Sequence, residues 1–365
     1  MGLQCGIIGI TNTGKTTLFN CVSETKAEAS NYAFSSNKSN IGVVNVRDPR
    51  LDKLSEMEKP EKTIPATVDI LDIPGLTKGS SKGEGVGNQF LSDIRNTDAL
   101  IHVLRCFDDE NLAHVDGSVD PVRDMETVDL ELQVKDLESV EKKIVRLGKL
   151  MKTGDKDAKH GVDVLNLYKD HFESFQSARG IELSDKDKKY VEDLSLLTNK
   201  PVLYVCNVDE ASAVSGNKYT EMVKEALKDS DAEILIIAAE LESDITELDN
   251  KEDRNAFLED MGLSEPGVNR LVRSAYALLN LQSFFTVGPK EVRAWTIKNG
   301  MTAPQAAGVI HSDLERGFIR AEMIKYNDYV ELGSENACKE KGKLSLEGKN
   351  YIVQDGDLLN IRFNV

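Results

Sequence analysis

One segment near the N-terminus has a clear chemical meaning. It reads Gly9-Ile10-Thr11-Asn12-Thr13-Gly14-Lys15-Thr16 and fits the pattern G-x-x-x-x-G-K-[ST]. The glycines let backbone N–H groups close around phosphate oxygens, Lys15 supplies positive charge to the β and γ groups, and the Thr16 hydroxyl is a ligand for Mg²⁺. An apolar run at Leu3–Ile8 precedes the motif and a helical pattern at Thr16–Val22 follows it. The sequence therefore predicts a nucleotide-phosphate site.

A second motif lies 56 residues downstream of the first. Asp72-Ile73-Pro74-Gly75 follows an apolar run at Thr67–Leu71. A carboxylate at a strand end can hold the water shell of magnesium, and the Gly75 N–H can donate to a γ-phosphate. The glycine-rich stretch Lys78–Gly87 has the composition of a switch segment that nucleotide orders.

Two further strand ends are predicted to frame the base. Asn207-Val208-Asp209-Glu210 follows the run Pro201–Cys206, and Ala238-Ala239-Glu240 ends the run Glu233–Ala239. In the guanine-reading signature N-K-x-D, a lysine flanks the base and an aspartate accepts hydrogen bonds from it. Val208 replaces that lysine and Glu210 replaces that aspartate, which weakens guanine selection. The alternative for Asn207 is an ordinary helix cap.

His114 is the predicted catalytic histidine. Leu76 stands where many nucleotide hydrolases carry the glutamine that orients the attacking water, and leucine neither donates nor accepts a proton. His114 lies in the polar loop Asp108–Asp120, and an imidazole can orient or deprotonate water near neutral pH. The alternative is a solvated loop histidine.

Short apolar runs must position these side chains. We interpret them as buried strands of a mostly parallel sheet in an α/β fold. Ile41–Val46 and Thr67–Leu71 are separated by a polar stretch with Pro49 and Pro60, as two strands of a long hairpin would be. The predicted strands are Leu3–Ile8, Ile41–Val46, Thr67–Leu71, Ala99–Leu104, Pro201–Cys206 and Glu233–Ala239.

Residues 125–200 differ from the rest in having dense charge, no proline and helical periodicity. One stripe consists of Leu130, Leu137, Val140, Ile144, Leu147 and Met151, with Gln133 in its polar slot, and a second of Leu165, Tyr168, Phe172 and Phe175. The spacing favours an antiparallel helical hairpin that projects from the domain. The alternative is a pair of helices packed against the sheet.

The last 85 residues predict a small α+β domain. Strand-like runs at Phe284–Val287 and Leu358–Phe363 flank a helical pattern at Thr302–Ser312, with Thr302 as N-cap and Pro304 in the first turn. We therefore divide the chain into a discontinuous nucleotide-binding domain, 1–124 and 201–280, a helical insertion, 125–200, and a C-terminal domain, 281–365.

Composition limits the class of protein. The 365 residues carry a net charge of −17, so the chain as a whole has no general affinity for nucleic acid. No run approaches the roughly 20 apolar residues of a membrane helix, and the five cysteines show no paired spacing, which indicates a reduced cytosolic protein. A lysine group in the C-terminal domain is a local RNA patch or, more simply, a solvated strand face: Lys339, Lys341, Lys343 and Lys349.

These residues resemble the YchF, or Obg-like ATPase, family of translation-factor-class P-loop NTPases. The resemblance rests on the phosphate loop with Asn12, on Asp72–Leu76 with the following Lys-Gly-Ser-Ser-Lys-Gly-Glu-Gly, and on Asn207–Glu210. It extends over nearly the whole chain. It implies a C-terminal TGS domain, which is a ubiquitin-like β-grasp module. It also implies slow hydrolysis with ATP preferred over GTP, and a cytosolic role at the ribosome in translation or stress responses.

The resemblance also implies residue roles. Val208 lies against the base, Ala238 and its neighbour Ala239 contribute backbone contacts, and the context His114-Val115-Asp116-Gly117 supports catalysis by His114. Asn31–Ser36 resembles a first switch in which Ser36, in place of threonine, is a second magnesium ligand, while Asn12 is a ligand for a potassium ion. The residues implied to bind the phosphates are Asn12, Thr13, Gly14, Lys15, Thr16 and Thr17.

Three functions remain open from the sequence. The first is a slow ATPase switch in which Mg²⁺ and nucleotide order the switch segments and change contacts with a large ribosomal partner. The second is a GTPase of the same architecture. The third is an adaptor with a structural nucleotide site that binds RNA or protein. A kinase is disfavoured because the sequence shows no acceptor site, and neither a membrane nor DNA is an expected partner.

Overall fold

The computed structural model describes residues 3–24, 40–75, 86–248 and 250–364, and it divides into two compact units. The first unit includes Met1–Glu24 and Asp69–Val268. The second includes Val43–Val68 and Asn269–Val365. These units differ from the three segments that we drew from the sequence, because residues 43–68 group with the C-terminal part and the helical insertion groups with the first sheet.

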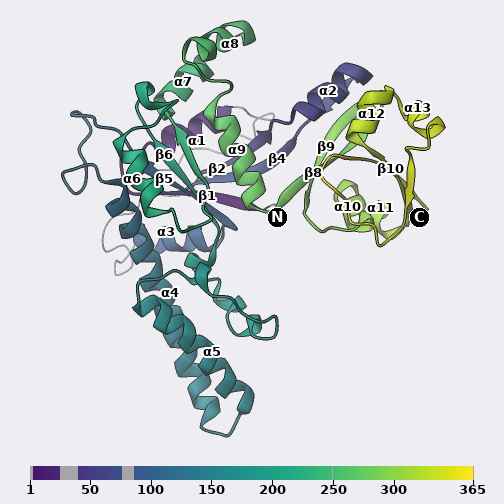
Figure 1. The fold of residues 1–365 in the computed structure, drawn as a ribbon. Coiled ribbons are helices and arrows are strands. Elements are labelled where there is room, and N and C mark those ends of the chain that lie inside the picture. The colour runs from purple at the N-terminus through teal and green to yellow at the C-terminus, as the bar shows by residue number, and fades with distance from the viewer. Residues whose placement is uncertain (1–2, 25–39, 76–85, 249, 365) are drawn as a thin grey trace. The chain divides into compact units, whose positions relative to one another are not determined.

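A six-stranded sheet has most of its strands in the first unit (Figure 1). Its order is β2-β4-β1-β5-β6-β7, and the pairs β4–β1, β1–β5, β5–β6 and β6–β7 are parallel. Parallel strands bring their carboxyl ends to one edge, where ligands bind in such sheets. The predicted α/β fold and its strands are therefore confirmed: β1(Gln4–Ile8), β2(Asn40–Val46), β4(Ala66–Asp72), β5(Ala99–Arg105), β6(Val202–Asn207) and β7(Ile234–Ile237).

Helices cover this sheet and bury its apolar side chains. All residues of β5 and β6 are buried, which explains why these strands are continuous apolar runs in the sequence. One core cluster joins strand residues such as Leu104 and Tyr204 to helix residues such as Phe90 and Val128. The helices are α1(Lys15–Glu24), α3(Val86–Arg95), α6(Lys218–Ala226), α7(Ala239–Glu247) and α8(Lys251–Asp260). Helix α9(Gly267–Leu278) begins at the end of the first unit, and its residues from Asn269 onward belong to the second.

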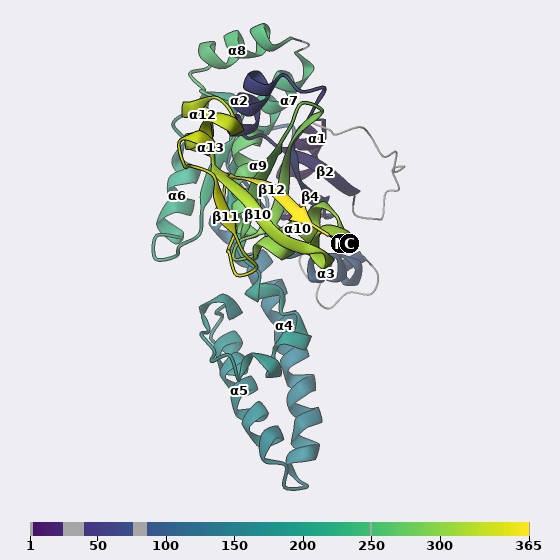
Figure 2. The same ribbon diagram turned by 90° about the vertical axis from the view of Figure 1, so that its right-hand side faces the viewer.

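Helices α4(Pro121–Met151) and α5(Lys156–Glu173) form the predicted hairpin and project from the sheet (Figure 2). Each begins at an aspartate whose side chain accepts a backbone N–H, Asp120 for α4 and Asp155 for α5. Their shared core contains Val140, Leu165, Tyr168 and Phe172. Short 3-10 turns over residues 178–199 follow and return the chain to β6.

Three end positions of the two predicted stripes are exposed instead of buried. Leu130 is 43% exposed, Met151 is 39% exposed and Phe175 is 75% exposed. Near its start α4 packs on the sheet core through Val128 and Leu132, so its buried face there is turned away from Leu130. Phe175 follows the last turn of α5 with a left-handed backbone, φ 56°, so the helical periodicity no longer applies to it.

The second unit contains a mixed sheet with the order β11-β10-β12-β8-β9-β3. β8 and β9 form an antiparallel pair, and the last strand, β12, lies parallel to β8, as in a β-grasp domain. Helix α10 covers one face through Ala303, Ala306 and Ala307. Thr302 is its N-cap, as predicted, and the Gln305 side chain completes a capping box by accepting the Thr302 N–H at 2.8 Å. The elements are β8(Leu281–Val287), β9(Glu291–Lys298), α10(Ala303–Ile310), α11(Ser312–Arg316), β10(Phe318–Lys325), α12(Tyr326–Leu332), α13(Glu335–Glu340), β11(Ser345–Glu347) and β12(Asp357–Phe363).

The stretch between β2 and β4 is not the loop of a simple hairpin. It contains helix α2(Pro49–Glu58), capped by Asp48, and strand β3(Lys62–Ile64). β3 pairs in parallel with β9, joining Lys62 to Glu291. β2 and β4 are neighbours as expected, but their connection supplies a strand to the second sheet.

Among the described residues, no helix has the length and apolar character required to cross a membrane. The five cysteines are all buried and free, in agreement with the absence of paired spacing in the sequence.

Candidate functional site

The loop between β1 and α1 has a backbone that requires its two glycines. Gly9 has φ 147° and Gly14 has φ 89°. A Cβ on Gly9 would lie 2.5 Å from the carbonyl oxygen of Val103, and one on Gly14 would overlap the Asn207 side-chain amide. Asn12 is left-handed without being glycine, φ 61°. Positive φ angles at these positions belong to the kind of loop backbone in which successive N–H groups can turn toward one anion.

Lys15, Thr16 and Asp72 meet where β1 and β4 end. The Lys15 ammonium is buried and donates to the Ile10 carbonyl. Burial lowers the pKa of Lys15 from 10.5 to about 8, and the Asp72 carboxylate opposes that shift. Thr16 Oγ1 donates to Asp72 Oδ2 at 3.1 Å. Burial raises the pKa of Asp72, against the effects of the Thr16 hydrogen bond and of Lys15. Two oxygen donors of the type that Mg²⁺ prefers therefore lie side by side.

Gly75 lies against this group. A Cβ on Gly75 would lie 3.1 Å from Lys15 Nζ, so a side chain here would displace the ammonium. Other predicted residues lie outside the described part of the chain. They are Leu76, the start of the switch-like stretch Lys78–Gly85, and Asn31–Ser36 with the second magnesium ligand Ser36.

Asn207 connects three segments that are far apart in the sequence. It is 5% exposed at the end of β6. Its Nδ2 donates to the Thr13 carbonyl at 2.9 Å, and its Oδ1 accepts the Ala239 N–H at 2.9 Å. Ala239 is the first residue of α7, so Asn207 also caps that helix from across the sheet edge. Both polar ends of this amide are therefore used within the protein.

Val208, Glu210 and Ala238 lie beside the loop without facing the cavity described below. Val208 and Ala238 are each 3% exposed and belong to the core of the first unit. Glu210 is exposed at the start of a short 3-10 turn, which Asp209 caps by accepting the Ser212 N–H. In this conformation these three side chains do not form the walls of a base pocket.

A cavity of about 570 Å³ lies against the phosphate loop. Arg105, buried at the end of β5, donates to the carbonyls of Phe107, Asp109 and Leu112 and so fixes one wall. Neither Arg105 nor this wall was predicted from the sequence. A buried arginine ending an apolar strand is the signal that could have found them. The lining residues are Asn12, Thr13, Gly14, Lys15, Thr16, Thr17, Phe107, Asp109, Leu112, Asn207, Ala239, Glu240, Ser243 and Asp244.

His114 is not among the residues lining this cavity. Its side chain is 5% exposed. Nε2 lies 2.9 Å from Asp124 Oδ2, and Nδ1 accepts the Asp116 N–H at 3.1 Å. The preceding residue, Ala113, contacts the phosphate loop, because its carbonyl accepts Asn12 Nδ2 at 3.1 Å. The histidine is thus near the site in the chain, but its imidazole bonds to helix α4.

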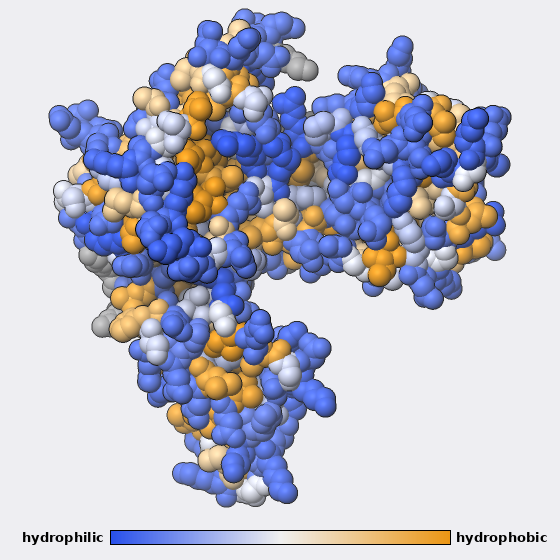
Figure 3. Space-filling view, in the orientation of Figure 1, coloured by the Kyte–Doolittle hydropathy of each residue, from blue (hydrophilic) through white to orange (hydrophobic). Residues whose placement is uncertain are grey.

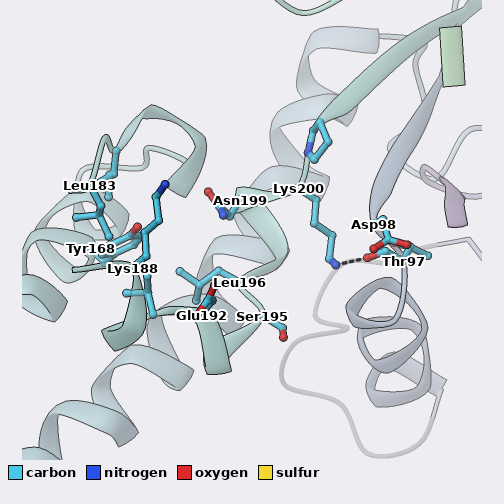
Figure 4. Close-up of a pocket in the computed structure, with 13 residues that line it drawn as sticks. Thr97, Asp98, Tyr168, Leu183, Lys188, Glu192, Ser195, Leu196, Asn199 and Lys200 are labelled. Carbon is cyan, nitrogen blue, oxygen red and sulfur yellow. Dashed lines mark hydrogen bonds between the residues drawn. The ribbon is translucent and has the colours of Figure 1, made fainter. Parts of the chain in front are cut away.

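A second cavity, of about 510 Å³, lies between the 3-10 turns after α5 and the sheet (Figure 4). Lys200 lines this cavity, and its ammonium donates to the carbonyls of Arg95 and Thr97. It contains none of the predicted site residues.

The lysine group of the C-terminal domain is not on a strand face. Lys339 lies in α13, and the other three are exposed residues outside any helix or strand. Lys343 pairs with Asp328 at 2.9 Å.

Comparison with known proteins extends over the whole chain. A family model described as a 50S ribosome-binding GTPase matches residues 4–148, and the YchF-GTPase_C model, described as a protein of unknown function, matches residues 281–364. Curated proteins named Ribosome-binding ATPase YchF, from Bacillus subtilis (strain 168) and Haemophilus influenzae, are each 48% identical to it over 100% of both chains.

A solved structure agrees with these matches. The Schizosaccharomyces pombe YchF GTPase superposes with a TM-score of 0.87 at 34% identity, covering 99% of this chain and 98% of that one. The phosphate loop, the sheet order and the β-grasp unit described above are consistent with this superposition. The chain belongs to the YchF family of P-loop nucleoside triphosphatases.

Proposed function

We propose that this protein is a slow, Mg²⁺-dependent ATPase that prefers ATP to GTP and acts in the cytoplasm as a nucleotide-controlled switch at the ribosome. The observation that carries the proposal is the grouping of Lys15, Thr16 and Asp72 beside a cavity at the carboxyl edge of a parallel sheet. Relatives named ribosome-binding ATPases support the substrate and the partner.

Each residue of the phosphate site has a distinct role in this proposal. The backbone N–H groups of Asn12–Thr17 bind the phosphates, and Lys15 neutralises the β and γ groups. The Thr16 and Ser36 hydroxyls would hold a magnesium ion, and Asp72 would hold its water shell. When bound, such an ion would supply positive charge that neutralises the phosphates. Gly75 donates its N–H to the γ-phosphate, and Asn12 also holds a potassium ion.

The proposed preference for ATP rests on two residues of the guanine-reading signature that are replaced here, the lysine by Val208 and the aspartate by Glu210. Without a lysine and an aspartate at these positions, guanine loses its specific partners, whereas adenine needs none of them. Phe107 and Leu112 add apolar surface to the cavity, which suits a base held by contact and by backbone groups of Ala238 and Ala239. One relative is named a GTPase, so the alternative of a GTPase has a specific observation in its favour.

His114 is the proposed group that orients or deprotonates the attacking water, since Leu76 cannot. In the observed position both ring nitrogens are hydrogen-bonded. Hydrolysis therefore requires the imidazole to leave Asp124. A protein that must first make this change is expected to turn over slowly.

The far half of the helical hairpin is the proposed ribosome contact. Residues 141–160 carry seven lysines or arginines and three acidic residues, whereas residues 121–140 carry two and six. The surface there is largely hydrophilic (Figure 3). Four exposed lysines form no ion pair within the described residues: Lys149, Lys152, Lys156 and Lys159. In a chain of net charge −17, this hairpin tip is complementary to RNA phosphates.

Competition against a fluorescent nucleotide, with Mg²⁺ and K⁺ present, tests the base preference. We expect wild type to bind ATP more tightly than GTP, and Glu210→Asp to shift the ratio toward GTP. Val208→Lys is added only after its unfolding has been measured, because Val208 is buried. A wild type that prefers GTP tenfold, about 1.4 kcal/mol, would establish the GTPase alternative.

Sedimentation with ribosomes tests the partner. Replacing Lys149, Lys152, Lys156 and Lys159 by glutamine is expected to reduce binding at least tenfold and to lower its salt dependence. The matched control replaces Lys339, Lys341 and Lys349. If the control variant loses binding and the tip variant does not, the partner contact lies in the C-terminal unit. Binding without turnover would favour the adaptor.

A further inference from the structure

We propose that Asp124 is a positioning residue that holds His114 in a resting position, so that helix α4 controls hydrolysis. The inference rests on the proposed function, because it takes His114 as the group that acts on water. It concerns regulation of that same site, and it assigns the control to the first turn of the helical hairpin.

The hydrogen bonds of His114 define the resting position. Because Nδ1 accepts the Asp116 N–H, the neutral imidazole carries its proton on Nε2 and donates it to Asp124. The side chain is 5% exposed. In this state the ring has no free lone pair for a water molecule, and it lies outside the cavity of the phosphate loop.

Asp124 is itself firmly held. Its side chain is 2% exposed, and Arg123 Nη2 lies 3.2 Å from its second carboxylate oxygen. Arg123 also lies 3.7 Å from Asp116 and donates its backbone N–H to the α4 cap, Asp120. A carboxylate in the first turn of a helix is further stabilised by the helix dipole. The Asp124 carboxylate is therefore fixed to the start of α4 and moves with it.

The segment before His114 is attached to different elements. Arg105 ties residues 107–112 to β5, and Asn12 ties Ala113 to the phosphate loop. His114 is thus the point where a segment fixed to the sheet meets a side chain fixed to α4. A change in the position of α4 relative to β5 must lengthen or break the His114–Asp124 hydrogen bond.

Helix α4 is long enough to connect this bond to a distant partner. It runs without interruption over 31 residues, about 45 Å at 1.5 Å per residue. Asp124 lies at one end, and the hairpin tip defined above lies at the other. A partner that binds the tip and shifts α4 would release His114 toward the nucleotide.

Phosphate release from ATP by wild type, Asp124→Ala, His114→Ala and the double variant tests the inference. Losing a charge-assisted hydrogen bond is expected to raise basal kcat about tenfold, or 1.4 kcal/mol. The gain must disappear in the His114→Ala background. The matched control is Asp129→Asn, a partly buried carboxylate on the same helix that pairs with Arg179 at 3.9 Å. It should leave kcat unchanged.

The outcomes separate the two proposals. If His114→Ala hydrolyses ATP like wild type, the proposed catalytic role fails. If His114→Ala is inactive but folded Asp124→Ala is no faster than wild type, only the positioning role fails. Should Asp124→Ala not fold, Asp124→Asn is compared instead, together with the imidazole ¹⁵N spectrum, which must show His114 leaving its single tautomer. Equal fold-stimulation of wild type and Asp124→Ala by ribosomes would exclude control through α4.

Discussion

The nucleotide edge of the sheet and the tip of the helical hairpin use polar side chains in opposite ways. At the edge, Asn207 joins Thr13 to Ala239 across 194 and 32 residues of sequence, and Thr16 reaches Asp72 across 56. At the tip, the lysines extend into solvent without partners among the described residues. The edge therefore works through fixed positions and the tip through charge alone, so substitutions in the two regions should have very different effects.

Asn207→Ala should have the largest effect. It leaves the Thr13 carbonyl and the Ala239 N–H without partners in a buried site, which we expect to lower the free energy of unfolding by about 3 kcal/mol. Nucleotide affinity should also fall at least tenfold, because the phosphate loop loses its support. Urea denaturation and fluorescent-nucleotide titration measure the two effects.

Asn217→Ala is the control for that variant. Asn217 also donates its side-chain amide to a backbone carbonyl, that of Cys106, and caps a helix, but it does not line the cavity. It should lower stability by about 1 kcal/mol without weakening nucleotide binding. Equal loss of affinity in both variants would contradict the role given to Asn207.

Asp136→Ala should have the next largest effect, in the buried part of the hairpin. Asp136 is fully buried and accepts hydrogen bonds from Leu197 N, Thr198 N and Thr198 Oγ1 at 2.7–2.8 Å. Its removal leaves three donors unpaired and should lower the free energy of unfolding by about 2–3 kcal/mol. Nucleotide affinity should stay within twofold of wild type. A loss of affinity as large as that of Asn207→Ala would mean that the two regions are not independent.

His102→Leu should instead stabilise the protein. His102 is buried in the middle of β5, and neither ring nitrogen has a hydrogen-bond partner in the described part of the chain. Burial, with smaller effects of Lys15 and Arg179, lowers the pKa of His102 from 6.5 to about 3. Below pH 6.5 the unfolded chain therefore binds a proton that the folded chain does not, and stability falls by about 1.4 kcal/mol per pH unit.

Chemical denaturation at pH 7.5 and pH 5 checks that prediction. The leucine variant should be more stable by about 1 kcal/mol at pH 7.5 and by about 2 kcal/mol more at pH 5. The same difference at both pH values would show that His102 does not titrate on unfolding.

Neutralising the tip should have the smallest effect on stability. Lysine-to-glutamine changes at positions 149, 152, 156 and 159 remove no ion pair within the described residues, so the free energy of unfolding should change by less than about 0.5 kcal/mol. Thermal unfolding at low salt measures it. A loss above 1 kcal/mol would mean that the tip charges contribute to the fold.

The sequence predicted the features that depend on local pattern. Strands buried on both faces read as apolar runs, and the phosphate loop is set by glycines whose φ angles few other residues adopt. The missed features depend on tertiary contacts. Arg105 and Asp124 are ordinary charged residues in the sequence, and only the packing of loop and helix shows that they hold the segment around His114. Leu130 fits a heptad by spacing, but the sheet determines which side of α4 is buried.

The same limit applies to domain organisation. No pattern between Pro49 and Pro60 indicates that the next residues join a sheet whose other strands are far away. Neither helix α2 with its cap at Asp48 nor the pairing of β3 with β9 was predicted from the sequence.

That pairing has a consequence for how the protein is made. Lys62 pairs with Glu291, and the Thr67 carbonyl accepts a hydrogen bond from the Thr296 hydroxyl. In each case the partner is synthesised 229 residues later. At a synthesis rate of about 5–20 residues per second, β3 spends roughly 10–45 s without its neighbouring strand. During this interval the nascent chain exposes an unpaired strand edge. If the first unit folds during synthesis, it does so before β3 can pair with β9.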